Sequence, residues 1–473
     1  MDHSGLSAFK GSLTDQPSMP LGQARNPRHS CSPDGLRIAL VSYRSNPYSG
    51  GQGIYVKYLS KALADLGHDV RVISGEPYPE LDDPVRLVPL PGMNFYDYPT
   101  ARAAVRERKL SCLTDVLEYL GYISGGFPEP RTFGRRLARY MAAHGRSFDI
   151  VHDNQSLCFG LLKIMAMDIP VVSTIHHPIT RDLTTALANE PQWGMRLLIR
   201  RWHSFLRMQK RVAPELEQIL TVSDCSRRDI VKDFKLEQDR ISVVHNGVDL
   251  SSFAPMDGVE REPFRIMATA SADVPLKGLN TLLEAIGLLK DDMPQLKLTV
   301  LGRPKTNGPT ARLVRELELG SRVRFVNNLT THELRTLYAR ASVAVVPSLY
   351  EGFGLPAAEA MACGVPVVST TGGALPEVVG QAGILVPPGE PLEMAGALKT
   401  LLASPELRHS LGRQGRRRME DNFTWDKAAR RTVQVYERLL AEQRTETREQ
   451  RSEDRGQKVA AAKTQDAAAG IQK

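Results

Sequence analysis

The chain has few cysteines, few aromatic residues and no long hydrophobic run. Its five cysteines are far apart, without a Cys-x-x-Cys pair or a cysteine–histidine cluster at zinc spacing, which argues against a disulfide framework and a zinc site. No apolar stretch approaches the roughly 18 residues that a membrane-spanning helix needs, and residues 1–34 lack the apolar core of a signal peptide. The sequence therefore predicts a cytoplasmic protein.

Acidic residues are outnumbered by basic ones. The 61 lysines and arginines exceed the 53 aspartates and glutamates, which gives a formal net charge of +8. This excess favours anionic partners such as phosphates, acidic lipids or nucleic acids, without choosing among them. No nucleic-acid-binding motif accompanies the charge, so we expect no nucleic-acid partner. With 42% hydrophobic residues, the 473-residue chain can bury the cores of two large domains.

Short apolar strands alternate with glycine turns and amphipathic helices along most of the chain. The segment 36–74 has the order strand, glycine turn, helix, strand, and Tyr55, Leu59 and Leu63 recur at helical spacing. The same order restarts near residue 263, after a segment with an Asn-Gly pair and two prolines that we interpret as a linker. Because continuous apolar runs are typical of buried parallel strands, we predict an α/β fold with two tandem Rossmann-like domains.

The composition also predicts the boundaries of these parts. We expect a disordered segment at 1–34, a first Rossmann-like domain at 35–249, a second at 250–421, a terminal helix at 422–443 and a charged, disordered tail at 444–473.

The stretch "SLYEGFGLPAAEAMACGVPVV" places two glutamates, Glu351 and Glu359, on either side of a glycine turn. Pro356 suits the first turn of a helix and Gly364 the position just past its end, so the predicted helix is Pro356–Cys363, with Glu359 in its first turn. Carboxylates suit the vicinal hydroxyls of a sugar or ribose, and the amides of the glycine turn suit an anion. The alternative is a helix-capping Glu359 with a solvated Glu351.

Three further sites lie where a parallel sheet binds ligands. Gly50 and Gly51 form a tight bend before a helix, a place for a phosphate or for acceptor hydroxyls. His176 follows a buried strand, with His177 as a less certain neighbour, and a histidine there can bond a sugar hydroxyl. Lys277 lies just before a helix and can meet a diphosphate.

These separated motifs together resemble the family 4 glycosyltransferases of the GT-B fold, whose hallmark is a glutamate pair spaced as Glu351 and Glu359 are. The resemblance covers roughly residues 36–443. It implies that the two sheets face a central cleft, that Glu359 binds the ribose of a nucleotide, and that Glu351 and His176 lie against the donor sugar. It also implies donor contacts from the backbones of Phe353, Gly354, Leu355, Gly372 and Gly373.

The chain departs from the family at one position. Members usually carry an arginine five positions before the lysine that Lys277 matches, and this chain has Ala272 there. Arg303, at the end of the next strand, is our candidate for a substitute in holding the diphosphate. Asp273 and Ser271 are alternative contacts to the nucleotide or sugar.

The resemblance implies a retaining transfer from a nucleotide-diphosphate sugar to an acceptor hydroxyl of a glycan, glycolipid or small polyol. Lys277 would meet the diphosphate and Glu351 would orient the sugar, with no metal and no cofactor. Because Ala272 weakens the grip on the diphosphate, a nucleotide-sugar-binding regulator or a catalytically weak paralogue is the alternative.

A basic stretch at 193–212, "WGMRLLIRRWHSFLRMQKRV", contains no acidic residue. A basic amphipathic helix with tryptophans can lie on an anionic membrane surface, so peripheral contact with the inner membrane surface is one expectation. The other is a helix packed on the sheet with a solvated basic edge.

Overall fold

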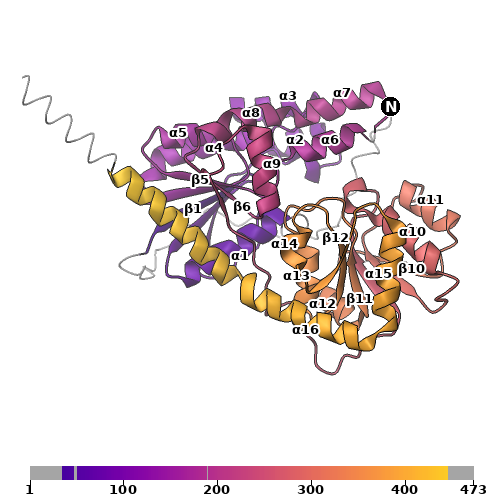
Figure 1. Cartoon of the computed structure of the whole chain (residues 1–473). Helices are drawn as coiled ribbons and strands as arrows, with labels where there is room; N and C mark the ends of the chain where they lie inside the picture. The colour runs from indigo at the N-terminus through magenta and orange to yellow at the C-terminus, as the bar shows by residue number, and fades with distance from the viewer. Residues whose placement is uncertain (1–34, 47–50, 189, 446–473) are drawn as a thin grey trace, which may run out of the picture.

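The computed structural model describes residues 35–46, 51–188 and 190–445, and these form two α/β domains joined by two crossings of the chain (Figure 1). Each domain contains one sheet, and every strand pair in both sheets is parallel. The predicted fold class is thereby confirmed. The predicted disordered segment 1–34, residue Gly50 and residues 446–473 of the predicted tail lie outside the described residues.

The first domain has a seven-stranded sheet in the order β3-β2-β1-β4-β5-β6-β7. Its strands are β1 (Arg37–Ser42), β2 (Asp69–Ser74), β3 (Arg86–Pro89), β4 (Ile150–Asn154), β5 (Val171–Ile175), β6 (Gln218–Thr221) and β7 (Ile241–Val243). Its α-helices are α1 (Gly51–Asp65), α2 (Ala101–Arg108), α3 (Leu113–Ile123), α4 (Glu129–His144), α5 (Phe159–Met165), α6 (Thr180–Ala188), α7 (Trp193–Trp202), α8 (Leu206–Val212) and α9 (Asp224–Phe234).

The second domain has a six-stranded sheet in the order β10-β9-β8-β11-β12-β13. Its strands are β8 (Arg265–Thr269), β9 (Lys297–Leu301), β10 (Val323–Val326), β11 (Val343–Val346), β12 (Val367–Thr370) and β13 (Gly383–Val386). Its α-helices are α10 (Leu279–Leu289), α11 (Pro309–Glu316), α12 (Thr331–Arg340), α13 (Leu355–Ala362), α14 (Leu375–Val379), α15 (Pro391–Ala403) and α16 (Pro405–Asn422).

Both sheets reverse their strand order at one place, between β1 and β4 in the first sheet and between β8 and β11 in the second. Ligands of open parallel sheets bind beyond the carboxyl ends of the strands at such a reversal. Asn154 is the last residue of β4 and His176 directly follows β5, whereas the connections after β8 and β11 contain Lys277 and Glu351. In the second sheet the topology therefore selects the same connections as the sequence motifs, and in the first sheet His176 follows β5, one strand beyond the reversal.

Two segments connect the domains, and they contact each other. Val248 donates a backbone hydrogen bond to Phe423 and forms an isolated parallel bridge with Thr424. No side chain fits at Gly247, because a Cβ there would lie 2.3 Å from the backbone nitrogen of Trp425. The linker predicted from its Asn-Gly pair is thus held against the second crossing.

After this crossing, the helix at 425–445 returns along the first domain (Figure 1). Trp425, Tyr436 and Leu439 are buried with Ile38 and Leu40 of β1 in one hydrophobic cluster. The Tyr436 hydroxyl lies 2.5 Å from Nδ1 of His152, a fully buried histidine of β4. The helix continues through residue 445, two residues beyond the end that we predicted. Within the described residues, no helix is long and apolar enough to cross a membrane.

Candidate active site

An ion pair at the carboxyl end of the second sheet joins two of the predicted residues. Lys277 Nζ lies 2.7 Å from Glu351 Oε1, although the two residues are far apart in the sequence. Ser348 donates a hydrogen bond of 2.7 Å to the same oxygen. Glu351 is mostly buried, whereas Lys277 keeps a third of its side chain exposed. The lysine can therefore reach a ligand while the carboxylate stays fixed.

Backbone packing fixes the position of this pair. Gly278, with a φ of +63°, lies so close to the loop after β11 that a Cβ would be 1.9 Å from the carbonyl oxygen of Pro347. Leu349 also donates a backbone hydrogen bond of 2.8 Å to Leu276. Because glycine adopts positive φ without strain and has no Cβ, the two loops can touch here. Their contact brings Lys277 to Glu351.

The amino end of α13 lies beside the ion pair. Gly354 caps this helix with a φ of +102°, and the first hydrogen bonds of the helix come from Ala357 and Ala358. The backbone amides of Phe353, Gly354 and Leu355 have no partner among the described residues. Free amides at a helix amino end attract anions. The Phe353 side chain itself is buried in the core of the second domain.

The first domain places a second helix amino end opposite α13. Gly51 is the first residue of α1, and a Cβ added to it would be 3.9 Å from Leu355 Cδ1. Gly51 is exposed. The two helix starts thus approach each other across the line where the domains meet. Gly50, the other predicted residue of this loop, lies outside the described residues.

Glu359 differs from its prediction in position and in charge. Helix α13 begins at Leu355, which places Glu359 in the second turn rather than the first, and α13 ends at Ala362. Burial raises the pKa of Glu359 to about 8, and a hydrogen bond with Tyr338 opposes this rise. At neutral pH the ligand-free protein therefore holds Glu359 mostly as the acid, which can donate one hydrogen bond and accept another. The capping alternative is wrong, because Glu359 lies beyond the first turn.

His176 comes from the first domain and meets the Glu351 loop. A Cβ on Gly352 would be 2.8 Å from the His176 carbonyl oxygen, so the two loops are in contact. His176 Nε2 lies 2.7 Å from Asn154 Oδ1, and its ring packs edge-on against Tyr55 at 4.6 Å. Burial lowers the pKa of His176 to about 3. The imidazole is therefore neutral at physiological pH, and its Nε2–H donates to Asn154.

The neighbouring His177 faces a different partner. Its Nε2 lies 3.0 Å from Asp182 Oδ2 at the start of α6, and both side chains are about a third exposed. This contact joins His177 to α6 rather than to the Lys277–Glu351 ion pair.

Gly372 and Gly373 contact the protein's own backbone. A Cβ on Gly373 would be 2.2 Å from the carbonyl oxygen of Glu351, and one on Gly372 would be 2.5 Å from that of Leu349. Ala374 donates a backbone hydrogen bond of 2.8 Å to Glu351. These glycines are therefore needed to let the chain support the Glu351 loop, whatever contacts a donor adds.

Two of the residues near Ala272 that were predicted to contact the donor are Arg303 and Asp273, and the structure gives them different surroundings. A Cβ on Gly302 would be 3.2 Å from the Ala272 nitrogen, so the loop with the exposed Arg303 lies against Ala272. The Asp273 carboxylate accepts backbone hydrogen bonds from Lys305 at 2.8 Å and Thr310 at 3.0 Å. Asp273 thus fixes this loop and the start of α11, which argues against its role as a nucleotide contact.

Sequence reasoning missed the contacts that hold the two domains together beside the site. The Glu377 carboxylate on α14 accepts hydrogen bonds of 2.7 Å from the amides of Asp224 and Cys225 at the start of α9. Ser223 donates a hydrogen bond of 2.7 Å to the Gly352 carbonyl oxygen. Glu377 lies in the first turn of its own helix, α14. It caps a helix of the other domain, and only the run "SDCS" at the start of α9 could have indicated that a helix begins there.

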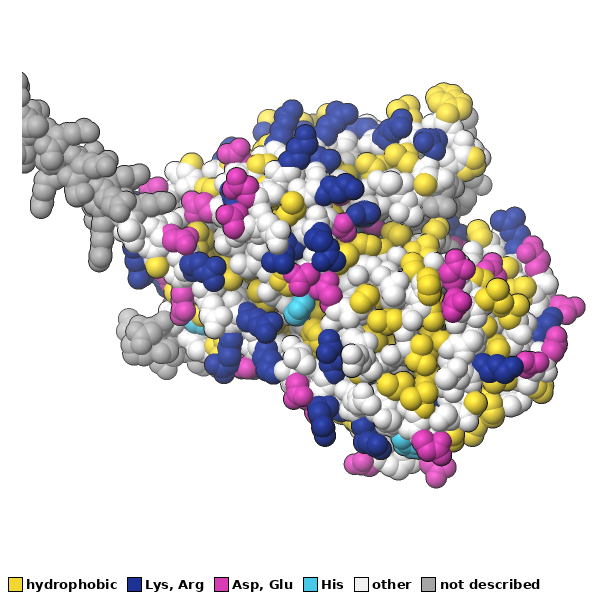
Figure 2. Space-filling model, in the orientation of Figure 1, with side chains coloured by type: hydrophobic (Ala, Val, Ile, Leu, Met, Phe, Trp, Pro, Cys, Tyr) yellow, Lys and Arg dark blue, Asp and Glu magenta, His cyan; other side chains and the backbone are white. Residues whose placement is uncertain are grey.

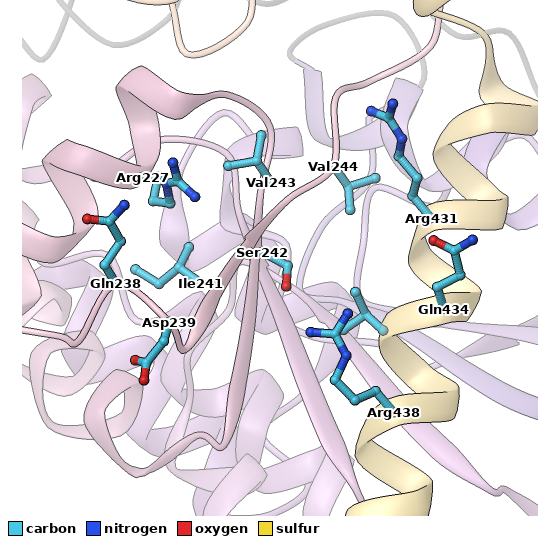
Figure 3. A pocket seen from close by; sticks show the side chains of 11 residues that line it. Arg227, Gln238, Asp239, Ile241, Ser242, Val243, Val244, Arg431, Gln434 and Arg438 are labelled. Atoms are coloured by element: carbon cyan, nitrogen blue, oxygen red, sulfur yellow. The ribbon is translucent and has the colours of Figure 1, made fainter.

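A surface groove of about 680 Å³ lies away from these residues, between edge strand β7 and the helix at 425–445 (Figure 3). Arg431, Gln434 and Arg438 line it from the helix, and Ser242 and Val243 line it from the strand. None of the predicted site residues lines this groove.

Comparisons with known proteins match both domains of the chain to glycosyltransferases. The model of Glycosyltransferase Family 4 matches residues 49–252, and the model of Glycosyl transferases group 1 matches residues 256–418. An MMP alpha-(1->4)-mannosyltransferase of Mycolicibacterium hassiacum is 46% identical over 410 residues, 86% of this chain and 99% of that protein. A D-inositol 3-phosphate glycosyltransferase of Kineococcus radiotolerans is 28% identical over 449 residues, 87% of this chain and 97% of that protein.

Among solved structures, sucrose-phosphate synthase of Thermosynechococcus elongatus is similar to this chain with a TM-score of 0.67 and 26% identity. The similarity covers 86% of this chain and 99% of that one. It therefore includes both domains and the line where they meet.

Proposed function

The chain belongs to the family 4 glycosyltransferases and is a hexosyltransferase, and on this premise we propose that it is a retaining, metal-independent enzyme. Its donor is a nucleotide-diphosphate sugar, and its acceptor is a hydroxyl group. No cofactor takes part. The observation that carries this proposal is the Lys277–Glu351 ion pair beside the free amides that start α13.

The proposed roles follow from the charges in the site. The Lys277 ammonium and the amides of Gly354 and Leu355 meet the diphosphate, whose negative charge grows as the bond to the sugar breaks. Glu351, fixed by Ser348, orients the sugar hydroxyls. Glu359 holds the ribose hydroxyls as donor and acceptor at once. In a retaining transfer without a protein nucleophile, the acceptor arrives on the face that the diphosphate leaves, and the departing phosphate takes the hydroxyl proton.

In this scheme His176 acts as an uncharged hydrogen-bonding group. Its buried, uncharged ring can hydrogen-bond a sugar hydroxyl through Nδ1, since Nε2 is occupied by Asn154. It does not supply a positive charge to the leaving group. That task stays with Lys277, with Arg303 as a second cation in place of the arginine that Ala272 removes.

The 46% identical relative is named a mannosyltransferase, and we extend the proposal to mannose as the transferred sugar and to a hydroxyl of a glycan as its acceptor. The location belongs to the same proposal. The four described cysteines, Cys112, Cys158, Cys225 and Cys363, are free thiols, which suits the reducing cytoplasm.

The test is a donor panel. We would incubate the protein with UDP-, GDP- and ADP-linked mannose and glucose, with and without EDTA, and measure released nucleoside diphosphate and the anomeric configuration of the product. We expect turnover with one mannosyl donor. EDTA should not reduce this turnover, and Glu351→Gln should abolish it. Glu318→Gln, at an exposed ion pair with Lys290, is the matched control and should leave turnover unchanged.

Tight binding of one donor without turnover by any acceptor would instead favour the catalytically weak alternative. Loss of turnover with EDTA would contradict metal independence, and an inverted product would contradict retention.

A further inference from the structure

Two neighbouring helices of the first domain expose apolar side chains that a globular protein normally buries. On α3, Leu113 and Ile123 are 68% and 53% exposed, and on α7, Trp193 and Leu197 are 83% and 61% exposed. Neither α6 nor α7 has a single buried residue, and α3 buries only Thr114 and Glu118. We call the following set the α3–α7 surface: Leu113, Leu117, Leu120, Ile123, Trp193, Met195, Leu197 and Leu198.

The two helices form one continuous surface. Arg201 on α7 donates a hydrogen bond of 2.5 Å to Ser124 at the end of α3. Leu198 lies over the next turn, because a Cβ on Gly125 would be 2.5 Å from its Cδ1. Figure 1 shows α3, α6 and α7 together at the top of the first domain, on the side away from the helix at 425–445. The exposed apolar side chains of both helices therefore act as one patch.

The patch is anchored from below. Trp202, at the end of α7, stacks on Phe127 with ring centroids 5.0 Å apart and meets Tyr96 edge-on at 5.8 Å. Trp202 thus fixes the helix to the domain, whereas Trp193 at the other end faces outward. The packed-helix expectation for 193–212 is wrong for α7, since the buried residues of this segment, Phe205 and those of α8, all follow α7.

On α7 the charged residues are all basic, and the acids of α3 are paired with a base. Helix α7 has no acidic residue, and the two acids of α3, Asp115 and Glu118, are both paired with Arg136 at 2.8 and 2.6 Å. Exposed basic residues follow along α7 and α8: Arg200, Arg201, Arg207, Lys210 and Arg211. Figure 2 shows dark blue and yellow side chains gathered along this upper edge. An apolar surface beside cations suits an anionic, partly apolar partner.

We propose that the α3–α7 surface docks on the surface of a bilayer that contains anionic lipid. Apolar side chains enter the boundary between headgroups and acyl chains, while arginines beside them meet lipid phosphates. A tryptophan at the end of such a helix suits the same boundary. A second copy of the chain is the less suitable occupant, because a two-fold interface would place the same arginines against one another.

Docking at this surface would leave the active site beside the membrane. Helix α6 begins three residues after His177 and leads directly to α7, and Arg181 on α6 packs over the ring of Tyr350, the neighbour of Glu351. The same helix pair thus connects the site to the surface. This inference stands on the exposed surface alone and does not depend on the identity of the donor.

The test is flotation of the full chain with vesicles of phosphatidylcholine, with and without phosphatidylglycerol, at low salt. We expect binding only to the vesicles with phosphatidylglycerol. The double variant Trp193→Ser/Leu197→Ser should lose at least about ten-fold in binding, and Arg200→Gln should lose about five-fold. Leu120→Ser, on α3, is an independent second variant that should also weaken binding.

Matched controls distinguish binding through the α3–α7 surface from non-specific hydrophobic binding to vesicles. Leu392→Ser removes an equally exposed leucine from α15 in the second domain and should bind as the unchanged protein does. Because all substituted residues are exposed, thermal unfolding of every variant should match that of the unchanged protein. Absence of binding at low salt, or binding that Trp193→Ser/Leu197→Ser leaves intact, would overturn the proposal. A dimer in lipid-free solution that the same double variant dissociates would also overturn it and assign the surface to a second copy.

Discussion

The two domains contribute chemically opposite halves to one site. In the second domain, Lys277 and Glu351 form an ion pair whose lysine is partly exposed. In the first domain, His176 is neutral, because burial lowers its pKa to about 3. A charged half and an uncharged half thus meet at Gly352.

This difference indicates a division of tasks. In the proposed transfer, the leaving diphosphate is the charged part of the donor, and the half that holds cations and free helix amides is suited to it. Sugar and acceptor hydroxyls are neutral, and a ring with one free nitrogen is suited to them. Interdomain hydrogen bonds to the Gly352 carbonyl oxygen and to Glu377 then fix the two halves relative to each other.

The largest expected effect comes from removing the cation of the charged half. Lys277→Ala should lower kcat/KM about 10²–10³-fold, because one preorganised charge at a developing anion contributes this much. Steady-state kinetics with the preferred donor would measure it. The matched control is Lys290→Ala, which removes a lysine paired with Glu318 far from the site and should leave kcat/KM unchanged. An equal loss in both variants would show that Lys277 acts on folding rather than on the donor.

The second prediction concerns Glu359, a carboxyl group of the second domain whose pKa is raised by burial. The folded pKa of Glu359 is about 8, against an ordinary value of 4.5. Between these values the unfolded chain has lost a proton that the folded chain keeps, so this group lowers stability as pH rises through the window. Glu359→Gln should therefore gain stability relative to the unchanged protein from about pH 4.5 to about 8, by at most about 1.4 kcal/mol per pH unit.

Thermal or urea unfolding at several pH values would measure this gap. Glu393→Gln, at an exposed position on α15, is the control and should show the same pH dependence as the unchanged protein. A gap that stays constant with pH would mean that Glu359 is ionised in the folded protein.

A smaller effect is expected from the neutral half. His176→Ala should lower kcat/KM about ten-fold, the contribution of a hydrogen bond between neutral groups. Because the pKa of His176 is about 3, the pH profile of kcat/KM between about pH 5 and 8 should have the same shape in His176→Gln as in the unchanged protein. An inflection near pH 6 that disappears in this variant would show that His176 titrates during catalysis.

Most of the fold could be predicted from the sequence, because buried parallel strands such as Ile38–Val41 and Val343–Val346 are continuous apolar runs with glycine turns after them. Motifs in the sequence led to the predicted site residues, and the structure brings Lys277 and Glu351 together. Their mutual contacts could not be predicted, since the Lys277–Glu351 pair depends on the close approach of two loops at Gly278 and Pro347.

Contacts between the two domains could not be predicted from the sequence for the same reason. Glu377 lies in the first turn of α14, and only the orientation of the two domains places its carboxylate at the amides of Asp224 and Cys225. Burial of Glu359 beside Tyr338 likewise depends on the packing of α12 against α13, which local sequence patterns do not report.

The smallest expected effect concerns Arg303, the residue that we propose as a substitute for the arginine that family members usually carry at the position of Ala272. Arg303 is exposed, and its loop touches Ala272, so its contact with a diphosphate is screened by solvent and should contribute about 1 kcal/mol. Arg303→Ala should therefore weaken nucleoside-diphosphate binding about five-fold in calorimetry, and Ala272→Arg in the same variant should restore it. Arg324→Ala, an exposed arginine on β10, is the control. If Arg303→Ala binds as the unchanged protein does while Lys277→Ala does not bind, Lys277 and the amides of α13 hold the diphosphate without a second cation.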